Sequence, residues 1–120
     1  MRFFQVSGSE YMPIQKYELR YLTVFYDDLS QIVDYITMVL RNPDAAVELV
    51  NLIESAIQGR SDCAESFEPY HTASERDLPY YAIYVNNYVI YYVVIDHQIM
   101  EVRRCLYKGR NRRKILDLNQ

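Results

Sequence analysis

The sequence has few cysteines and no long apolar run, and both absences restrict its class. Its 120 residues include only two cysteines, Cys63 and Cys105, which lack the paired spacing of a zinc site or a disulfide scaffold. No stretch approaches the roughly 18 apolar residues of a membrane helix, and the first residues lack the apolar run of an export signal. We therefore expect a cytoplasmic protein with two reduced thiols and without a membrane segment, a metal or a cofactor.

The length and the charge distribution set further limits. Half of the residues are hydrophobic, which is enough for one domain with its own core. The net charge is −3, but residues 103–114 carry seven basic side chains and no acid, so the rest of the chain carries −10. A concentrated basic end favours a phosphate-rich or acidic protein partner, and the alternative is a solvated basic tail.

Two helices are expected in the first half of the chain. From residue 24 to residue 41 apolar side chains recur at three- and four-residue steps, which predicts an amphipathic helix with Asp28 on its polar side. Asn42 and Pro43 are typical of the start of a second helix, and Gly59 offers a left-handed stop at its end. The short connection predicts an antiparallel helical hairpin.

The second half of the chain reads as a meander of strands. The β-branched and aromatic runs AIYV and VIYYVVI flank Asn86 and Asn87, which tolerate the positive φ of a tight turn. A second turn at residues 96–97 leads into a third strand, and residues 16–22 alternate like a strand that precedes the helices. Residues 89–95 are apolar on both sides, so that strand is either covered on both faces or uses one face for binding. The expected fold class is α+β in the order βααβββ.

The order of these elements resembles the RelE/ParE superfamily of bacterial toxins, also described as plasmid stabilisation proteins. The likeness is carried by DLSQIVDYI in the first helix, NPDAA at the start of the second, NNYVIYYVV in the hairpin and RRCLYKGRNRRKIL at the end. It covers residues 16–116 and implies a helical hairpin packed on a curved antiparallel sheet. Residues 1–15 are then an N-terminal extension, and residues 16–120 form a single toxin domain with a basic C-terminal end.

The resemblance implies three alternative functions. RelE-like members cut messenger RNA on the ribosome: a base deprotonates the ribose 2′-hydroxyl, and cationic side chains stabilise the charge that develops on the phosphate. ParE-like members inhibit DNA gyrase by binding it, and both kinds are silenced by a cognate antitoxin. The chain is thus expected to be a ribosome-dependent endoribonuclease with the ribosome and messenger RNA as partners. The alternatives are a gyrase inhibitor and an inactive toxin-fold protein that only binds its antitoxin.

The resemblance also places candidate catalytic residues around the end of the last strand. Arg110 stands where such toxins carry an arginine, and Tyr107 three residues earlier is the candidate acid or base. Arg104, or Arg103 if the register differs, would point from the last strand onto the substrate. The expected RNA-binding residues are the other basic residues of this end: Arg103, Lys108, Arg112, Arg113 and Lys114. An antitoxin segment is expected to place acids against Arg103, Arg104 and Arg110.

The chain departs from RNA-cleaving members of the family at two places. Their strand before the hairpin contributes lysine or arginine, whereas this chain has Tyr80, Tyr81, Ala82 and Tyr84. Their C-terminal tyrosine is replaced near Leu116, which leaves Tyr107 for its role. Exposed tyrosines stack on unpaired bases for about 1–3 kcal/mol each. The alternative is that Tyr80, Tyr84, Tyr88 and Tyr92 only pack within the sheet or at its edge.

Overall fold

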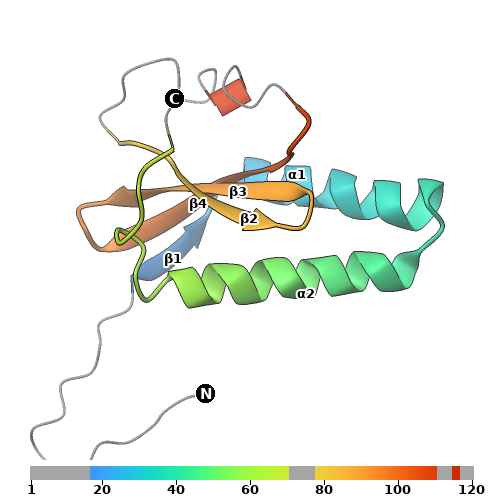
Figure 1. Ribbon diagram of the computed structural model, residues 1–120, viewed down its shortest axis with the longest axis horizontal. Helices are drawn as coiled ribbons and strands as arrows, with labels where there is room; N and C mark the ends of the chain where they lie inside the picture. The colour runs from blue at the N-terminus through green and yellow to red at the C-terminus, as the bar shows by residue number, and fades with distance from the viewer. Residues whose placement is uncertain (1–16, 71–77, 111–114, 117–120) are drawn as a thin grey trace, which may run out of the picture.

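The computed structural model describes residues 17–70, 78–110 and 115–116, and its elements follow the expected order βααβββ. The expected extension at residues 1–15 lies outside the described residues. Four strands form one sheet in the order β1-β4-β3-β2, and their bounds are β1 Glu18–Tyr21, β2 Tyr81–Val85, β3 Tyr88–Ile95 and β4 Ile99–Tyr107. Figure 1 shows the helices on one face of this sheet and the short turn at residues 115–116 on the other.

The helical hairpin consists of α1 (Thr23–Asp34), a π-helical continuation η1 (Tyr35–Val39) and α2 (Pro43–Arg60). A regular α-helix was expected to residue 41, but the Leu40 N–H donates to the Tyr35 carbonyl at 3.1 Å, five residues back. The start of α2 is confirmed, because the Asn42 side chain accepts a hydrogen bond from the Ala45 N–H at 3.1 Å. Within the described ranges, neither helix has the length and apolar content needed to cross a bilayer.

The expected stop of the second helix at Gly59 is wrong. The helix continues to Arg60, and Ser61 ends it with an ordinary φ of −66° and a hydroxyl that donates to the Gln58 carbonyl at 2.6 Å. The Ser61 carbonyl in turn accepts from the Tyr17 N–H at 3.0 Å. The contact with the start of β1 therefore fixes this helix end, and no left-handed residue is needed.

The sheet is mixed rather than wholly antiparallel. Strands β2, β3 and β4 pair antiparallel as expected, but β1 runs parallel to β4 in the register Glu18↔Ile99. The two helices return the chain to the end of the sheet where β1 began, so β4 runs in the direction of β1 after two further reversals (Figure 1). Both predicted turns are confirmed by positive φ values, which are 53° at Asn86, 55° at Asp96 and 56° at His97.

The central strand β3 is covered on both faces, which resolves the alternative left by the sequence. One cluster faces the helices and joins Phe25, Ile53 and Ile57 to the sheet residues Ile83, Ile90, Tyr92, Met100 and Val102. The other cluster lies on the opposite face and contains Tyr80, Val89, Tyr91, Val93, Leu106 and Leu116. Four tyrosines between residues 80 and 92 are buried in these clusters, namely Tyr80, Tyr81, Tyr91 and Tyr92, whereas Tyr84 is exposed.

Tyr92 ties the sheet to the loop after α2. Its hydroxyl donates to the Ala64 carbonyl at 2.7 Å and accepts from the Arg60 guanidinium at 2.9 Å. The same guanidinium lies 3.6 Å from the ring centroid of Phe67. Burial raises the pKa of Tyr92, and the Arg60 hydrogen bond opposes this shift. The phenol therefore stays protonated and continues to donate.

We expect Tyr92→Phe to lower the free energy of unfolding by about 1–3 kcal/mol, because the buried Ala64 carbonyl loses its donor. Tyr84→Phe is the matched control, since the exposed Tyr84 side chain should tolerate the change within about 0.5 kcal/mol. Urea unfolding of both variants measures the difference. Equal midpoints for the two variants would contradict this role of Tyr92.

Candidate functional site

A groove of about 660 Å³ opens between the helical hairpin and the end of the β3–β4 pair. One wall comes from α1, η1 and the residue after it: Asp28, Gln31, Ile32, Tyr35 and Leu40. The other wall comes from the sheet: Asn87, Tyr88, Cys105, Tyr107 and Arg110. Two of the three predicted catalytic residues, Tyr107 and Arg110, therefore line the same groove.

A tight turn after β4 places Tyr107 and Arg110 together. The Arg110 N–H donates to the Tyr107 carbonyl at 3.1 Å. Gly109 lies between them, and a Cβ at this position would come within 2.6 Å of the Tyr107 ring. A side chain at Gly109 would push that ring away, so the glycine allows the turn to close beneath it. The ring also contacts Tyr88 edge-on, with centroids 5.9 Å apart.

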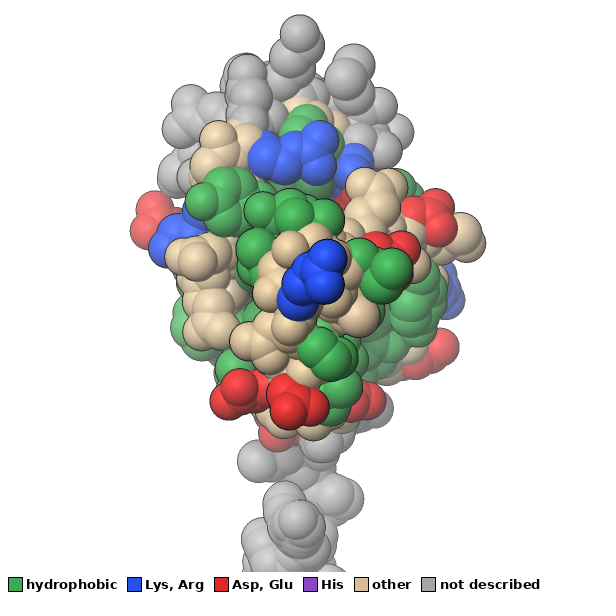
Figure 2. All heavy atoms as spheres, turned by 90° about the vertical axis from the view of Figure 1, so that its right-hand side faces the viewer, with side chains coloured by type: hydrophobic (Ala, Val, Ile, Leu, Met, Phe, Trp, Pro, Cys, Tyr) green, Lys and Arg blue, Asp and Glu red, His purple; other side chains and the backbone are tan. Residues whose placement is uncertain are grey.

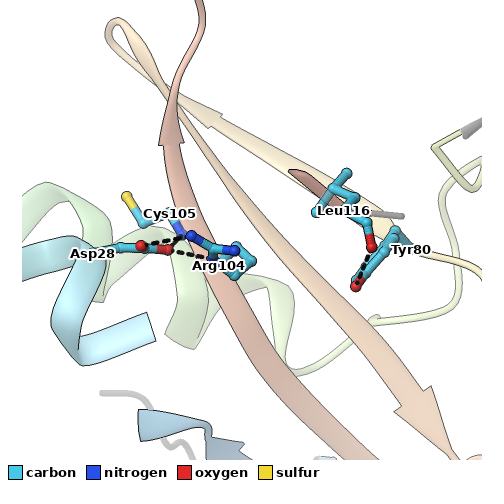
Figure 3. Close-up of polar contacts among 5 residues, drawn as sticks. All are labelled: Asp28, Tyr80, Arg104, Cys105 and Leu116. Carbon is cyan, nitrogen blue, oxygen red and sulfur yellow. Dashed lines mark hydrogen bonds and ion pairs between the residues drawn. The ribbon is translucent and has the colours of Figure 1, made fainter. Parts of the chain in front are cut away.

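Arg104, the third predicted catalytic residue, is bound within the protein. Its Nε and one Nη donate to the two carboxylate oxygens of Asp28 at 2.7 and 2.9 Å, and both side chains are nearly buried, at 11% and 8% exposure. The Cys105 backbone N–H donates to the same carboxylate at 3.0 Å. Figure 3 shows Asp28 reaching from α1 to these two neighbouring groups of β4. Because its Nε and one Nη both donate to Asp28, the Arg104 guanidinium binds within the protein and does not point toward a substrate in the groove.

This contact continues the edge of the sheet where β1 ends. The last β1 pair joins Tyr21 to Val102, and the Leu22 N–H donates to the Val102 carbonyl at 3.0 Å. Beyond that point the Asp28 carboxylate takes the place of a neighbouring strand for the Cys105 N–H. An aspartate on α1 therefore both covers a strand edge and neutralises a buried arginine.

Two ionisable groups around this contact are shifted. The hydrogen bonds from Asp28 raise the pKa of Arg104 against the opposing effect of burial, so the guanidinium remains charged. Burial, with a smaller contribution from the Asp28 charge, raises the pKa of the Cys105 thiol to about 12. Cys105 lines the groove but is not a nucleophile at neutral pH, because the thiolate is the reactive form.

Of the five predicted RNA-binding residues, the structure describes Arg103 and Lys108, and neither lines the groove. The β3–β4 register shifts at Tyr91/Tyr92, so Arg103 is an extra residue without a partner in β3. Its Nε and Nη2 donate to the buried Glu101 carboxylate at 3.0 and 2.9 Å. Lys108 lies near Tyr84, with its Nζ 6.0 Å from the ring centroid, and does not line the groove. The remaining predicted residues, Arg112, Arg113 and Lys114, lie outside the described residues.

The sequence reasoning missed Asp28, although a signal was present. Asp28 stands three residues after Phe25 and four before Ile32, so it falls on the apolar stripe of the helix rather than on the polar side where it was expected. A carboxylate on such a stripe has to find a buried cation or donor. The sequence could have raised that question, but it did not name the partner.

The groove is suited to binding an anionic or amphipathic ligand. Arg110 offers an exposed guanidinium, Tyr107 a half-exposed phenol, and Ile32, Leu40 and Tyr88 an apolar lining. The groove's carboxylate, Asp28, is already bound to Arg104. Among residues 17–70, 78–110 and 115–116 there is no group of three side chains that would hold a metal ion.

Comparison with known proteins identifies the fold. No protein-family model and no curated protein matches the chain. Among solved structures, a chain of the chromosomal ParDE TA system from P. aeruginosa superimposes with a TM-score of 0.61 at 17% sequence identity. The match covers 77% of this chain and 96% of that chain. At this identity the likeness shows the fold, which is the ParE/RelE-like α+β fold that the sequence predicted.

We expect Asp28→Asn to lower the free energy of unfolding by about 3–5 kcal/mol, because it leaves the buried Arg104 charge without its counter-ion. Asp27→Asn is the matched control, since Asp27 is the neighbouring and exposed aspartate of the same helix. Denaturant unfolding of both variants tests this. A loss for Asp28→Asn as small as that for Asp27→Asn would show that the pair contributes little.

The two cysteines should differ in reactivity. At pH 8 Cys63, which is partly exposed, should be alkylated by iodoacetamide, whereas Cys105 should react only after unfolding. Its pKa of about 12 means that the thiolate population stays low until the pH approaches that value. Mass spectrometry of native and denatured samples counts the modified sites. Rapid alkylation of Cys105 in the native protein would contradict the burial of this thiol.

Proposed function

We propose that this protein is the toxin of a toxin–antitoxin pair, and that it acts by binding its target through the groove around Arg110. The fold supports this assignment, because the structure it resembles belongs to a ParDE TA system. Fold alone does not carry function, so the site has to agree with it. The groove agrees, since it presents one exposed cation within an apolar lining.

The observation that carries the choice of binding over RNA cleavage is the Asp28–Arg104 pair. RNA cleavage requires a base, an acid and several cations around the phosphate. Of the three predicted catalytic residues, Arg104 is bound by Asp28 at 2.7 and 2.9 Å. Tyr107 and Arg110 remain, which is a small set for chemistry and a sufficient one for recognition.

Cleavage of messenger RNA on the ribosome is the second candidate. It is favoured by the shared position of Tyr107 and Arg110 on one groove, where a phenol and a guanidinium could act on the same phosphate. Tyr84 with Lys108 beside it would add a stacking surface for an unpaired base. In this alternative the ribosome and messenger RNA take the place of a protein target such as DNA gyrase.

An antitoxin is the expected partner in both cases. Arg103 and Arg104 already bind Glu101 and Asp28, so the acids of an antitoxin are expected at Arg110 rather than at all three arginines. The apolar walls of the groove would accept the apolar side of an amphipathic segment. The protein encoded by the neighbouring reading frame is the candidate to co-express.

Induction of the chain in bacteria should arrest growth, and co-expression of the antitoxin should restore it. Tyr107→Phe keeps the ring and removes the hydroxyl. A toxin that acts by binding should still arrest growth with this change, whereas a ribonuclease that uses the hydroxyl should not. Arg110→Glu should abolish arrest, because it reverses the charge of the groove. Arg20→Lys, remote from the groove and with its charge kept, is the control.

Mapping of messenger 5′ ends in the same cultures separates the two mechanisms. Arrest by Tyr107→Phe without new 5′ ends supports binding. New 5′ ends that disappear in Tyr107→Phe would move the assignment to RNA cleavage. Absence of arrest by the wild-type chain at verified expression would contradict the toxin assignment.

A further inference from the structure

The two edges of the sheet differ in how they are protected. Strand β1, at one edge, carries the charged residues Glu18 and Arg20, and charged side chains are a common protection of an edge strand. Strand β2, at the other edge, has the sequence YAIYV and no charge. An uncharged edge strand of β-branched and aromatic residues is a template for pairing with another strand. The edge of β2 is therefore the one that favours the addition of a strand.

The outward backbone groups of β2 belong to Ala82 and Tyr84. The Tyr80 carbonyl accepts a hydrogen bond from the Tyr70 N–H at 2.6 Å, on the side away from β3. Alternate residues of a strand direct their N–H and C=O groups to the same side, so those of Ala82 and Tyr84 point outward as well. The pairing with Tyr70 is a single bridge. In the described part of the chain, the outward groups of Ala82 and Tyr84 have no hydrogen-bond partner.

A groove of about 570 Å³ lies beside these backbone groups, and we call it the β2 groove. Its lining combines two residues of β2 with the end of α2 and the loop that follows: Ala82, Tyr84, Arg60, Phe67, Glu68, Pro69 and Tyr70. Figure 1 shows this loop, in green, rising from the end of α2 beside the sheet. The rings of Phe67 and Tyr84 are 47% and 58% exposed. The groove has room for one extended segment, whereas a second folded copy would meet the loop.

Arg60 gives the β2 groove a positive charge without a counter-ion. Its guanidinium lies on the helix side of β2, where it donates to the Tyr92 hydroxyl at 2.9 Å and stacks on the Phe67 ring at 3.6 Å. Among the residues that the structure describes, no carboxylate forms an ion pair with it, and this includes Glu68. A guanidinium that is fixed in this way and lacks a counter-ion favours a carboxylate.

The other charges around the β2 groove agree with an acidic ligand. Lys108 lies beside Tyr84, with its Nζ 6.0 Å from the ring centroid. Glu68 is the one acid that lines the groove, and it is exposed to solvent, where its charge is screened. The exposed apolar surface at the tip of the helical hairpin is different. Figure 2 shows a basic side chain in the middle of that surface and acidic ones beside it and below it, so its charges select no single partner.

We propose that the β2 groove binds an extended, acidic segment of a partner protein, which adds a fifth strand to the sheet. The segment exchanges backbone hydrogen bonds with Ala82 and Tyr84, as in other cases of strand addition. Its alternate side chains point to opposite faces of the sheet. Those on the helix side reach Arg60 and suit a carboxylate, whereas those on the other side pack over the small Ala82 and suit an apolar residue.

The β2 groove is separate from the groove around Arg110, because the two share no lining residue. A segment bound at β2 therefore leaves the candidate site accessible to a target or an antitoxin. Binding at β2 requires only the open strand edge and Arg60, so it holds whether or not the protein is a toxin.

Fluorescence polarisation with labelled, end-blocked peptides and the full chain tests the proposal. The probe is a six-residue peptide in which valine and glutamate alternate, and we expect saturable binding. Lysine in place of glutamate should weaken binding by about tenfold or more, because it places a cation beside Arg60. N-methylation of the valine amides should weaken it similarly, because these amides donate to β2. N-methylation of the glutamate amides is the matched control, since those amides point away from β2.

Variants of the protein test the same contacts from the other side. Arg60→Gln should weaken binding of the probe by about tenfold, and Arg41→Gln is the control with the same change of charge at the far end of the helical hairpin. Melting curves verify that both variants fold. In the wild-type chain, amide exchange by NMR should slow at Ala82 and Tyr84 when the probe binds, and should not change in β1.

Four results would overturn the proposal. The first is the absence of binding at peptide concentrations up to about 1 mM. The second is equal affinity for the glutamate and lysine peptides, and the third is an equal effect of methylation at the valine and glutamate amides. The fourth is a dimer of the chain alone in which the amides of Ala82 and Tyr84 are already protected, since a second copy would then occupy this edge.

Discussion

The carboxylate of Asp28 holds the helical layer and the sheet in register. It binds the Arg104 guanidinium and the Cys105 backbone N–H at the same time, and it does so where β1 no longer covers the edge of β4. A buried ion pair is costly to desolvate, and here three hydrogen bonds to one carboxylate offset that cost. Because α1 is fixed to β4 in this way, η1 stands opposite the end of β4 and a groove remains between them.

The same contact changes what the site can do. Arg104 joins the two layers through Asp28 and is therefore not free to bind a phosphate. The groove thus lacks one of the cations that a ribonuclease would use. What remains is a cation and a phenol on a short turn, with apolar walls on both sides. Such a surface is better suited to holding a partner than to performing acid–base chemistry, and that is the physical basis of the proposal that this protein acts by binding.

The sequence predicted the elements whose signals are local. The order βααβββ, the Asn42 cap and both hairpin turns depend on a few neighbouring residues, and the structure confirms them. Of the candidate catalytic residues, Tyr107 ends β4 and Arg110 follows three residues later, so their closeness in the sequence is enough to place both on one groove. The role of Asp28 was missed, since its partner lies 76 residues away. The π-turn and the end of α2 were also missed, because packing rather than local preference decides them.

The parallel pairing of β1 with β4 has a consequence for the order of folding. The meander from β2 to β4 closes short loops, whereas the contacts of β1 and Asp28 with β4 close a loop that spans most of the chain. During synthesis, β1 and α1 leave the ribosome first and β4 leaves it last among the strands. The groove consequently cannot assemble on a nascent chain until β4 is made, so an incomplete chain has no finished surface with which to act.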